Sequence, residues 1–592
     1  MIEVIFRSKS FDASPMKKQI IEKSIEAIDD LFPPSIYENW EICNRYLSHS
    51  LIVLVNANDF HIISGKVAGI HLKTGRYLRE INQHRKAETH LKKAMAFYKT
   101  IRDTKIDTVT VCINELALLY ESQGKYKKAE QLHLIALNNR RKEFGENHFA
   151  TTTSCGHLAS LYFSQGRYEE AESLYLKALN INKKILGDEH LEVSICLDNL
   201  GCLYKNQGRF LESEACFQNA LEIRRKISGE MHPSVATLYN NLGVLYEARS
   251  KYSEAEQFYL KAVKIYRELL GENHLSISIC YNNIGELYTN QGKYKEAESY
   301  FLKALKIRYE LLGKDHLTSI VCQSNLALLY FWQGRYKKAE SIYKRVLKLR
   351  QKLLGENHPD TANSYSNLAA VYELLEKYEE AESFHINGLK IRQRLLGEDH
   401  PDTANSYVNL AGLYESQHKY GKAEAIYLKA LEIREKILGT SHPLTAATYN
   451  NLAVLYEVKK NPHKAEEFYL KALKICQEKL GENHINTATS LNNLGRLYYS
   501  LDKYTKAEAF YFKALNIYQK QLGDNHPEIT DTYNNLAVLY HAQDRLNKAL
   551  PFYEKAYSIL SQCLGHNHSQ TQTIKRNLAL CRKEFSAKKQ RF

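Results

Sequence analysis

The sequence predicts an all-α protein, a solenoid of stacked helix pairs, from three observations. The phrase LGENHPDTANSYSNLAAVY at 354–372 returns 42 residues later as LGEDHPDTANSYVNLAGLY at 396–414. A fixed period of this length is typical of repeat arrays rather than of separate globular domains. Apolar residues within each period recur at helical spacing, and no segment makes a convincing strand. Small side chains return at fixed positions, as at Ala369 and Ala381, where they allow neighbouring helices to approach to about 8 Å.

Each period is predicted to hold two helices joined by a short turn. In the unit after Gly355, residues 359–375 form the first helix and residues 379–396 form the second. Gly397 suits the left-handed residue that closes a helix, and a proline directly after the repeating histidine suits the first helical position. No unit can cover its own apolar face, so stability is expected from the stacking of neighbours.

The extent of the period divides the chain into three predicted parts. Residues 1–62 form an N-terminal helical segment of two amphipathic helices, separated by Pro33 and Pro34. Residues 63–564 form the solenoid, with about twelve helix pairs. Residues 565–592 form a C-terminal capping helix and a basic tail.

The net charge of +14 is spread along the predicted helices. Phrases such as GKYKKAE and LKALKIRYELLG mix Lys and Arg with Glu, which is typical of a solvated helix face. No RRM signature accompanies them, so the sequence does not favour a nucleic-acid partner. The longest aliphatic run, LIVLV at 51–55, is too short to cross a bilayer, and the eleven cysteines include no CxxC pair. We therefore expect a cytoplasmic protein with no membrane partner.

Eleven of the 23 histidines occupy one position of the period, three residues after a repeating glycine. Ligands of a zinc ion lie about 2.0 to 2.3 Å from it, whereas equivalent residues of successive helix pairs are roughly 10 Å apart. Four such histidines cannot converge on one ion, and identical positions cannot supply the different roles of a catalytic site. We therefore predict no metal, no cofactor and no enzyme activity. Each histidine is expected to organise the loop before a first helix, with one ring nitrogen bonded to the backbone.

The order LAxxY at 368–372, followed by Ala381, Phe384 and Gly388, resembles the tetratricopeptide repeat (TPR). The longer period and the LGENHP phrase resemble the 42-residue version found in kinesin light chains and their bacterial relatives. Eleven such units run from about residue 108 to 563, and a degenerate one lies at 66–102. The resemblance implies a right-handed superhelical solenoid with short helical caps, and a role in binding proteins.

Two features of the N-terminal segment bear on the partner. Kinesin light chains, as the resemblance implies, bind the motor heavy chain through an N-terminal heptad coiled coil. Residues 1–62 show no sustained heptads, which argues against a motor heavy chain as partner. The segment YENWEICNRYLSHSL at 37–51 resembles what precedes the repeats in some bacterial proteins that couple a signalling NTPase to the array. The sequence has no GxxxxGK[ST] loop, so an ATPase, if one is required, is a separate chain.

An asparagine recurs just before the Leu or Ile of ten successive predicted first helices, opposite their buried side. Its amide offers a donor and an acceptor together. In TPR proteins the first helices line the concave face, and in some an asparagine ladder there holds the main chain of an extended peptide. The resemblance carries that role onto Asn199, Asn241, Asn283, Asn325, Asn367, Asn409, Asn451, Asn493, Asn535 and Asn577. The alternative is that these amides bond to the neighbouring first helix for structure alone.

The rest of the predicted groove carries few charges, and Trp332 is its expected aromatic anchor. These observations favour a non-catalytic scaffold or adaptor that binds extended peptide segments of partner proteins in the concave groove. One alternative is the sensor or regulatory array of a signalling system whose ATPase is a separate chain. Another is a nucleic-acid-binding solenoid, which would show a steep salt dependence of binding.

Overall fold

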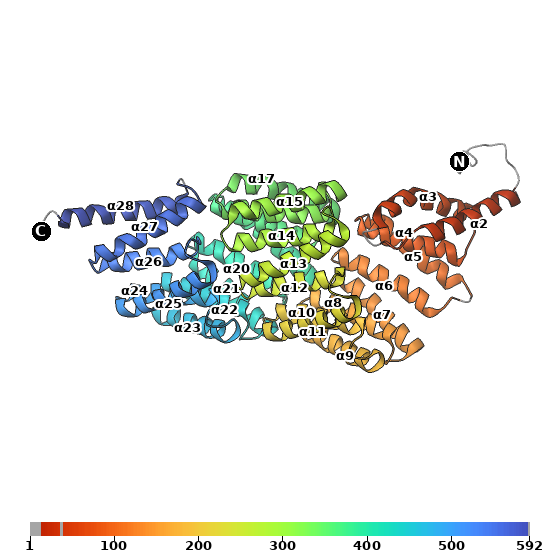
Figure 1. Ribbon diagram of the computed structural model, residues 1–592, viewed down its shortest axis with the longest axis horizontal. Helices are drawn as coiled ribbons and strands as arrows, with labels where there is room; N and C mark the ends of the chain where they lie inside the picture. Colours follow the sequence, from red (N-terminus) through yellow and green to blue (C-terminus); the bar gives the residue numbers. More distant parts are fainter. Residues whose placement is uncertain (1–13, 36–38, 103, 567, 590–592) are drawn as a thin grey trace. The chain divides into compact units, whose positions relative to one another are not determined.

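The computed structural model describes residues 14–35, 39–102, 104–566 and 568–589. All regular structure in these ranges is helical, in 27 helices numbered α2 to α28 (Figure 1). Eleven antiparallel helix pairs within the two units, the first α4 with α5 and the last α26 with α27, confirm the predicted solenoid. The chain divides into two compact units, residues 1–162 and 163–592.

Unit 1 contains two helices that precede the repeats, followed by the first pairs of the array. The helices are α2 Ser14–Leu31, α3 Trp40–Asp59, α4 Gly65–Glu80, α5 His84–Thr100, α6 Ile106–Ser122, α7 Tyr126–Phe144 and α8 Phe149–Ser164, which ends just beyond the unit. Ile21 and Ile25 of α2 pack against Val53 of α3 and against Val67 and Ile70 of α4. The two preceding helices therefore cover the apolar end of the array in this unit.

Unit 2 continues the same alternation of a 16-residue first helix and a second helix of about 19 residues. Its helices are α9 Tyr168–Leu186, α10 Leu191–Asn206, α11 Phe210–Ser228, α12 Pro233–Ala248, α13 Tyr252–Leu270, α14 Leu275–Asn290, α15 Tyr294–Leu312, α16 Leu317–Trp332, α17 Tyr336–Leu354, α18 Pro359–Leu374, α19 Tyr378–Leu396, α20 Pro401–Ser416, α21 Tyr420–Leu438, α22 Pro443–Val458, α23 Pro462–Lys479, α24 Ile485–Ser500, α25 Tyr504–Leu522, α26 Ile529–Ala542, α27 Leu546–Cys563 and α28 Ser569–Lys589.

Small residues set how closely the two helices of a pair approach. Ala369 and Ala381 are fully buried, as predicted from their recurrence. At Gly243 the ring of Tyr259 lies so near that a Cβ atom would come within 2.5 Å of it. These contacts fix the position of each second helix on its own first helix. The second helix also packs on the first helix of the next repeat.

Polar side chains bind successive repeats to one another. Arg308, buried on α15, donates to Ser278 Oγ of its own repeat at 3.0 Å and to the carbonyl of Thr318 in the next at 2.6 Å. Tyr330 of α16 donates its hydroxyl to Glu298 of α15 at 2.8 Å. The tyrosine link recurs in unit 2 at Tyr246, Tyr288, Tyr414, Tyr456, Tyr498 and Tyr540, and an arginine reaches the next repeat in the same way at Arg224, Arg350 and Arg434.

The repeating glycine and histidine shape the loop between repeats. Gly355 ends α17 with a φ of 94°, and ten equivalent glycines adopt a similar left-handed φ. His358 then caps α18, because its Nδ1 accepts a hydrogen bond from the amide of Asp360 at 3.1 Å. This confirms the predicted role of the histidine. The same contact is made by His148, His190, His232, His274, His316, His400, His442, His484 and His526.

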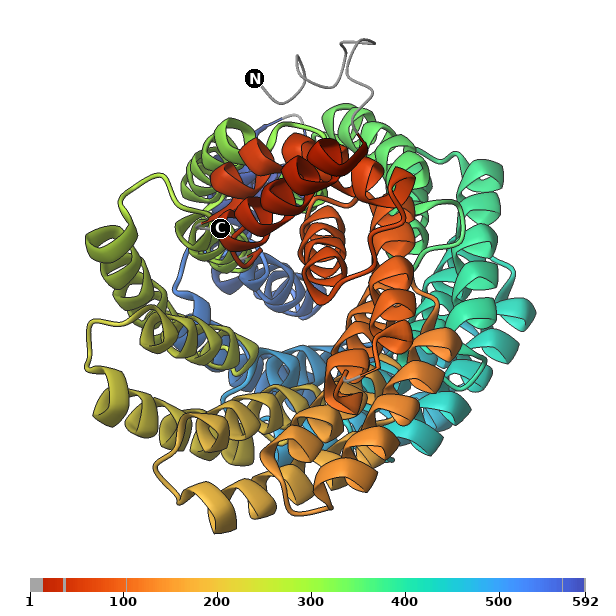
Figure 2. The ribbon, with the colours of Figure 1, turned by 90° about the vertical axis from the view of Figure 1, so that its right-hand side faces the viewer.

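The first helices lie on the inner side of the curved array in unit 2. Successive first helices contact one another directly, for example α10 with α12, α12 with α14 and α14 with α16. Among the described helices, no two successive second helices pack as extensively. Elements that converge lie on the inside of a curve, so the first helices form the concave face. Figure 2 shows the helices of unit 2, from yellow to blue, winding around in a coil.

Unit 2 curves far enough for one turn to contact the next. His442 Nε2 lies 3.2 Å from the carbonyl oxygen of Asn206, which precedes it by 236 residues. At the same separation, His484 lies 3.3 Å from the carbonyl of Ala248, and His526 lies 3.0 Å from that of Asn290. Because Nδ1 of each ring accepts the capping bond, Nε2 carries the proton and donates to the carbonyl. We term this contact between turns the histidine clasp.

Candidate functional site

Each first helix of unit 2 presents one row of side chains on the concave face, and these rows form the candidate site. The row holds the fifth, ninth, twelfth and sixteenth residues after the repeating histidine, which share one helix face. On α16 they are Val321, Asn325, Leu328 and Trp332. We term the succession of these rows from α10 to α26 the inner strip. Every predicted site residue lies on it except Asn577, which takes the same position on α28.

The ten asparagines occupy the ninth position of the row. Nine are half-buried and Asn409 is exposed. Side chains at this position line up from repeat to repeat because neighbouring first helices pack directly. The structure therefore places the predicted residues in one continuous line along unit 2.

Six of the ten amides donate a hydrogen bond to the eighth residue of the preceding first helix. The pairs are Asn241 to Asp198 (2.8 Å), Asn283 to Asn240 (2.9 Å), Asn325 to Asn282 (3.2 Å), Asn367 to Ser324 (3.4 Å), Asn535 to Asn492 (3.2 Å) and Asn577 to Asn534 (3.4 Å). These are the bonds expected from a structural role. Most of them use a single N–H, so the amide oxygen and often the second N–H keep their bonding capacity.

The remaining four asparagines are Asn199, Asn409, Asn451 and Asn493. Their side chains have no hydrogen bond with another residue in the part of the chain that the structure describes. Three of the four belong to the later repeats. The eighth residue that precedes Asn451 is Val408, which offers no acceptor, whereas Ser366 and Asn450, which precede Asn409 and Asn493, bond to other residues. The line of asparagines thus has a tied part near α12 to α18 and a part near α20 to α24 whose amides are available.

Apolar side chains of the inner strip gather on α14, α16 and α18. Trp332 is 54% exposed and stacks edge-on against Phe331, with ring centroids 5.5 Å apart. The other members of this group are Ile279, Val321, Leu328 and Leu374, which are 41 to 49% exposed. Exposed apolar groups in one patch mark contact sites for partners more often than scattered ones do.

Four carboxylates border this apolar group. Glu247, Glu373 and Glu415 follow the tyrosine near the end of their first helices, and Glu286 lies in the row of α14. They accept hydrogen bonds from neutral groups, among them Tyr259 to Glu247 at 2.8 Å. Burial raises the pKa of all four, and that of Glu247 to about 7. Our sequence analysis overlooked three of them, although the repeated Tyr-Glu pair was the signal that could have found them.

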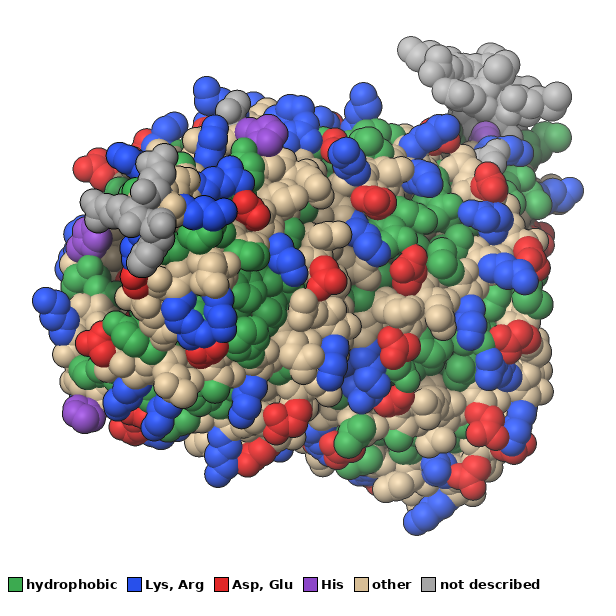
Figure 3. All heavy atoms as spheres, turned by 60° about the vertical axis from the view of Figure 1, so that its left-hand side comes forward, with side chains coloured by type: hydrophobic (Ala, Val, Ile, Leu, Met, Phe, Trp, Pro, Cys, Tyr) green, Lys and Arg blue, Asp and Glu red, His purple; other side chains and the backbone are tan. Residues whose placement is uncertain are grey.

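The surface charge does not single out a binding site for nucleic acid. On the face drawn in Figure 3, Lys and Arg side chains are interspersed with Asp and Glu. Many cations are paired, as in Lys344 with Glu340 at 2.7 Å. Within the described ranges, no three His, Cys, Asp or Glu side chains come together as metal ligands would. None of the described helices combines the length and apolar character needed to cross a membrane.

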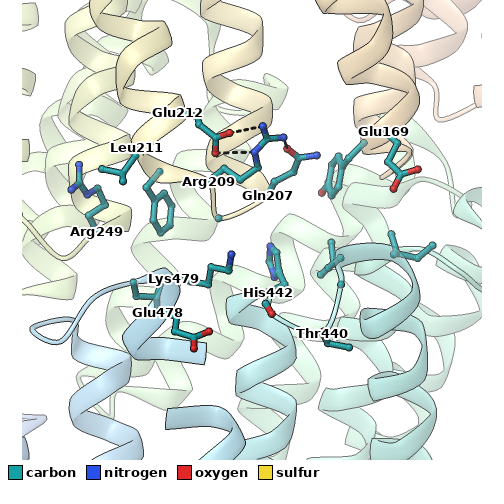
Figure 4. A pocket seen from close by; sticks show the side chains of 18 of the residues that line it. Glu169, Gln207, Arg209, Leu211, Glu212, Arg249, Thr440, His442, Glu478 and Lys479 are labelled. Atoms are coloured by element: carbon teal, nitrogen blue, oxygen red, sulfur yellow. Dashed lines mark hydrogen bonds and ion pairs between the residues drawn. The ribbon is translucent and has the colours of Figure 1, made fainter. Parts of the chain in front are cut away.

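A crevice of about 770 Å³ lies between two turns of unit 2, beside the clasp of His442 (Figure 4). His442 and Thr440 enter it from the loop before α22, and Gln207, Arg209 and Glu212 enter it from the loop and helix opposite. Most of its cations are already paired, so the crevice offers no concentrated charge. The pairs are Arg209 with Glu172 and Glu212, Arg249 with Glu214, and Lys436 with Asp399.

Comparisons with known protein families show which family the repeats belong to. A family model described as tetratricopeptide repeat matches residues 149–210, 203–268, 251–310, 318–386, 365–436, 407–470, 444–520, 501–562 and 528–588, and a second model of that description matches residues 109–150. No curated protein matches the chain.

Among the solved structures that are similar to this chain are those of two proteins at low identity. BtubC (BKLC) from P. vanneervenii is 23% identical with a TM-score of 0.32, and the match covers 42% of this chain and 92% of that one. Two structures of the nearly identical TPR-like repeats of a Podosopora anserina kinesin light chain are 23% identical with TM-scores of 0.30. Their matches cover 35% of this chain and 97% of theirs.

Proposed function

Because the chain belongs to the tetratricopeptide repeat family, we propose that it is a cytoplasmic, non-catalytic scaffold that binds extended peptide segments of partner proteins along the inner strip. The family and the concave line of first helices support a protein-interaction role. The finer assignment, to a peptide backbone held by asparagine amides, is our proposal.

One observation gives the strongest support to the proposal that asparagine amides hold a peptide backbone. Asn409 and Asn451 lie on the concave face, and their amides have no partner among the described residues. A surface role alone would accept Lys, Glu or Ser at this position, whereas an amide can accept from a peptide N–H and donate to a peptide carbonyl. The neighbouring Asn367 has only a long bond of 3.4 Å to Ser324. These three consecutive amides are the proposed centre of peptide binding.

The test replaces Asn367, Asn409 and Asn451 together by Ala. Each exchanged hydrogen bond contributes about 0.5 to 1.5 kcal/mol, so affinity for a captured partner should fall roughly tenfold or more. Folding should hardly change, because the bond lost by Asn367 is a long one and Ala has a better helix propensity than Asn by a few tenths of a kcal/mol per site. Affinity is measured by titration with the partner identified by capture and mass spectrometry, and stability by calorimetry.

A matched control replaces three asparagines of the connecting loops by Ala. Asn357, Asn483 and Asn525 are exposed and lie off the inner strip. This variant should bind the partner as the parent does. A groove variant that melts markedly lower and yet binds with unchanged affinity would contradict the proposal and favour a structural role for these amides.

A further inference from the structure

The apolar group on α14, α16 and α18 is exposed to solvent in the structure, and the charges around it indicate which kind of ligand would bind there. Val321, Leu328 and Trp332 lie in one row on α16, with Ile279 and Leu374 on the neighbouring helices. Each of these side chains is about half exposed. A row of apolar side chains between polar neighbours is the arrangement that receives the anchors of a peptide.

The carboxylates that border the group lack ionic partners. Glu247, Glu286, Glu373 and Glu415 form no ion pair with any described residue, and their hydrogen bonds come from hydroxyl and amide groups. The cations that influence Glu247, Glu286 and Glu415 are Lys205, Arg308 and Arg496, which act only at longer range. Partly buried carboxylates without a cation are costly, and a cationic ligand would relieve that cost.

From this complementarity we propose that the inner strip of α12 to α20 binds a basic amphipathic peptide, with apolar side chains on the Val321–Trp332 row and Lys or Arg on the flanking carboxylates. The inference rests on the proposed peptide-binding function and gives it a ligand class.

The spacing of the helices sets the length of this peptide. Neighbouring packed helices are about 8 to 10 Å apart, and four such intervals separate α12 from α20. An extended chain covers about 3.3 Å per residue, so roughly ten to twelve residues reach from Glu247 to Glu415. The apolar anchors fall near the middle of that length and the basic residues toward its ends.

The experiment selects peptides from a random twelve-residue phage library on the full chain. The proposal expects enriched sequences with central apolar or aromatic residues and flanking Lys or Arg. A synthetic copy of the most enriched peptide is then titrated against two variants. The first changes Glu247, Glu286, Glu373 and Glu415 to Gln, which keeps the size and hydrogen-bonding shape of each side chain. The second makes the same change at Glu254, Glu296, Glu379 and Glu380, which are exposed on second helices.

We expect the inner variant to bind the peptide at least tenfold more weakly and to lose most of the salt dependence of binding, while the control variant behaves as the parent. The Tm of the inner variant should be no lower than that of the parent, because the substitutions remove partly buried charges, whose burial opposes folding. Enriched peptides that are neutral or acidic, or a basic peptide bound equally by both variants, would overturn the inference. If the binding of such peptides is still weakened by replacing Asn367, Asn409 and Asn451, the proposed peptide-binding function stands but the basic ligand class is wrong. If no peptide is enriched, both the proposed function and the ligand class are wrong.

Discussion

At the scale of single residues, the asparagine of the inner strip has capacity for two roles at once. In Asn283 one N–H bonds to Asn240 of the preceding helix at 2.9 Å. The amide oxygen of the same side chain keeps two lone pairs. A residue that ties helices together and still accepts a bond from a ligand needs an amide, which explains why Lys, Glu or Ser do not replace it.

The tied and available asparagines should differ in what they contribute to stability. Asn325→Ala removes the bonds to Asn282 and Glu286 and leaves the half-buried carboxylate of Glu286 with Asn282 as its remaining donor. We expect it to lower the free energy of unfolding by about 0.5 to 1.5 kcal/mol. Asn409→Ala removes no such bond and should leave stability unchanged or slightly raised. Urea unfolding of the two single variants checks this, and an equal loss in both would contradict the distinction.

The sequence predicted which asparagines form the line and could not predict their bonds. The acceptor lies 43 residues earlier and varies in type, from Asp198 to Asn240 to Ser324. Whether an amide is tied depends on this variable residue, which has no fixed signature. The capping bond of His358 was predictable, because it is local and the same loop recurs in every repeat.

At the scale of the elements, boundaries followed from local chemistry. The first helix predicted at 359–375 is Pro359–Leu374, and the second predicted at 379–396 is Tyr378–Leu396. Proline, the capping histidine and the closing glycine each act within a few residues of a helix end. The curvature that brings the first helices to the inside depends on packing between repeats, so the periodicity alone did not reveal it.

The glycine that closes each second helix is required for its backbone conformation, and substitution tests this. Gly355 has a φ of 94°, and nothing lies within 4 Å of a Cβ atom built on it. Gly355→Ala should therefore destabilise the protein through backbone strain alone, by about 1 to 3 kcal/mol. Gly421 also has open space but lies inside α21, so Gly421→Ala should be neutral or stabilising. Thermal melts of both variants check this, and a neutral Gly355→Ala would contradict it.

At the scale of the whole unit 2, the clasps add contacts that a simple stack of repeats lacks. An array held only by neighbours is stabilised one interface at a time. Here the loop at Gly208 meets Pro443, and the loop at Gly292 meets Pro527, so residues far apart in sequence stabilise each other. The separation of 236 residues is about 5.6 periods of 42, which is not a whole number. No repeat pattern in the sequence therefore pointed to these pairs.

The clasp histidines should make stability depend on pH. A protonated ring cannot accept the capping bond at Nδ1, and burial lowers the pKa of His442 and His484, and that of His526 to about 4. In the unfolded chain a histidine titrates near 6.5. Above about pH 7.5 both states are neutral and the contribution is constant. As the pH falls below 6.5, the unfolded state binds protons that the folded state does not, so the free energy of unfolding decreases.

His484 suits this test, because burial lowers its pKa and no charged group contributes to the shift. His484→Asn keeps a side-chain oxygen to cap α24 but cannot titrate and is too short to reach Ala248. Between pH 7.5 and 5.0 the variant should lose less stability than the parent, with a difference in slope of at most 1.36 kcal/mol per pH unit. At pH 7.5 it should be less stable by about 0.5 to 1.5 kcal/mol, for the lost clasp. Urea unfolding at both pH values measures these effects.

The control variant is His232→Asn. His232 is an exposed cap, and its hydrogen bonds to described residues are both made with Ser234 of its own repeat. An equal change of slope in this control would show that capping, rather than the contact between turns, causes the pH dependence.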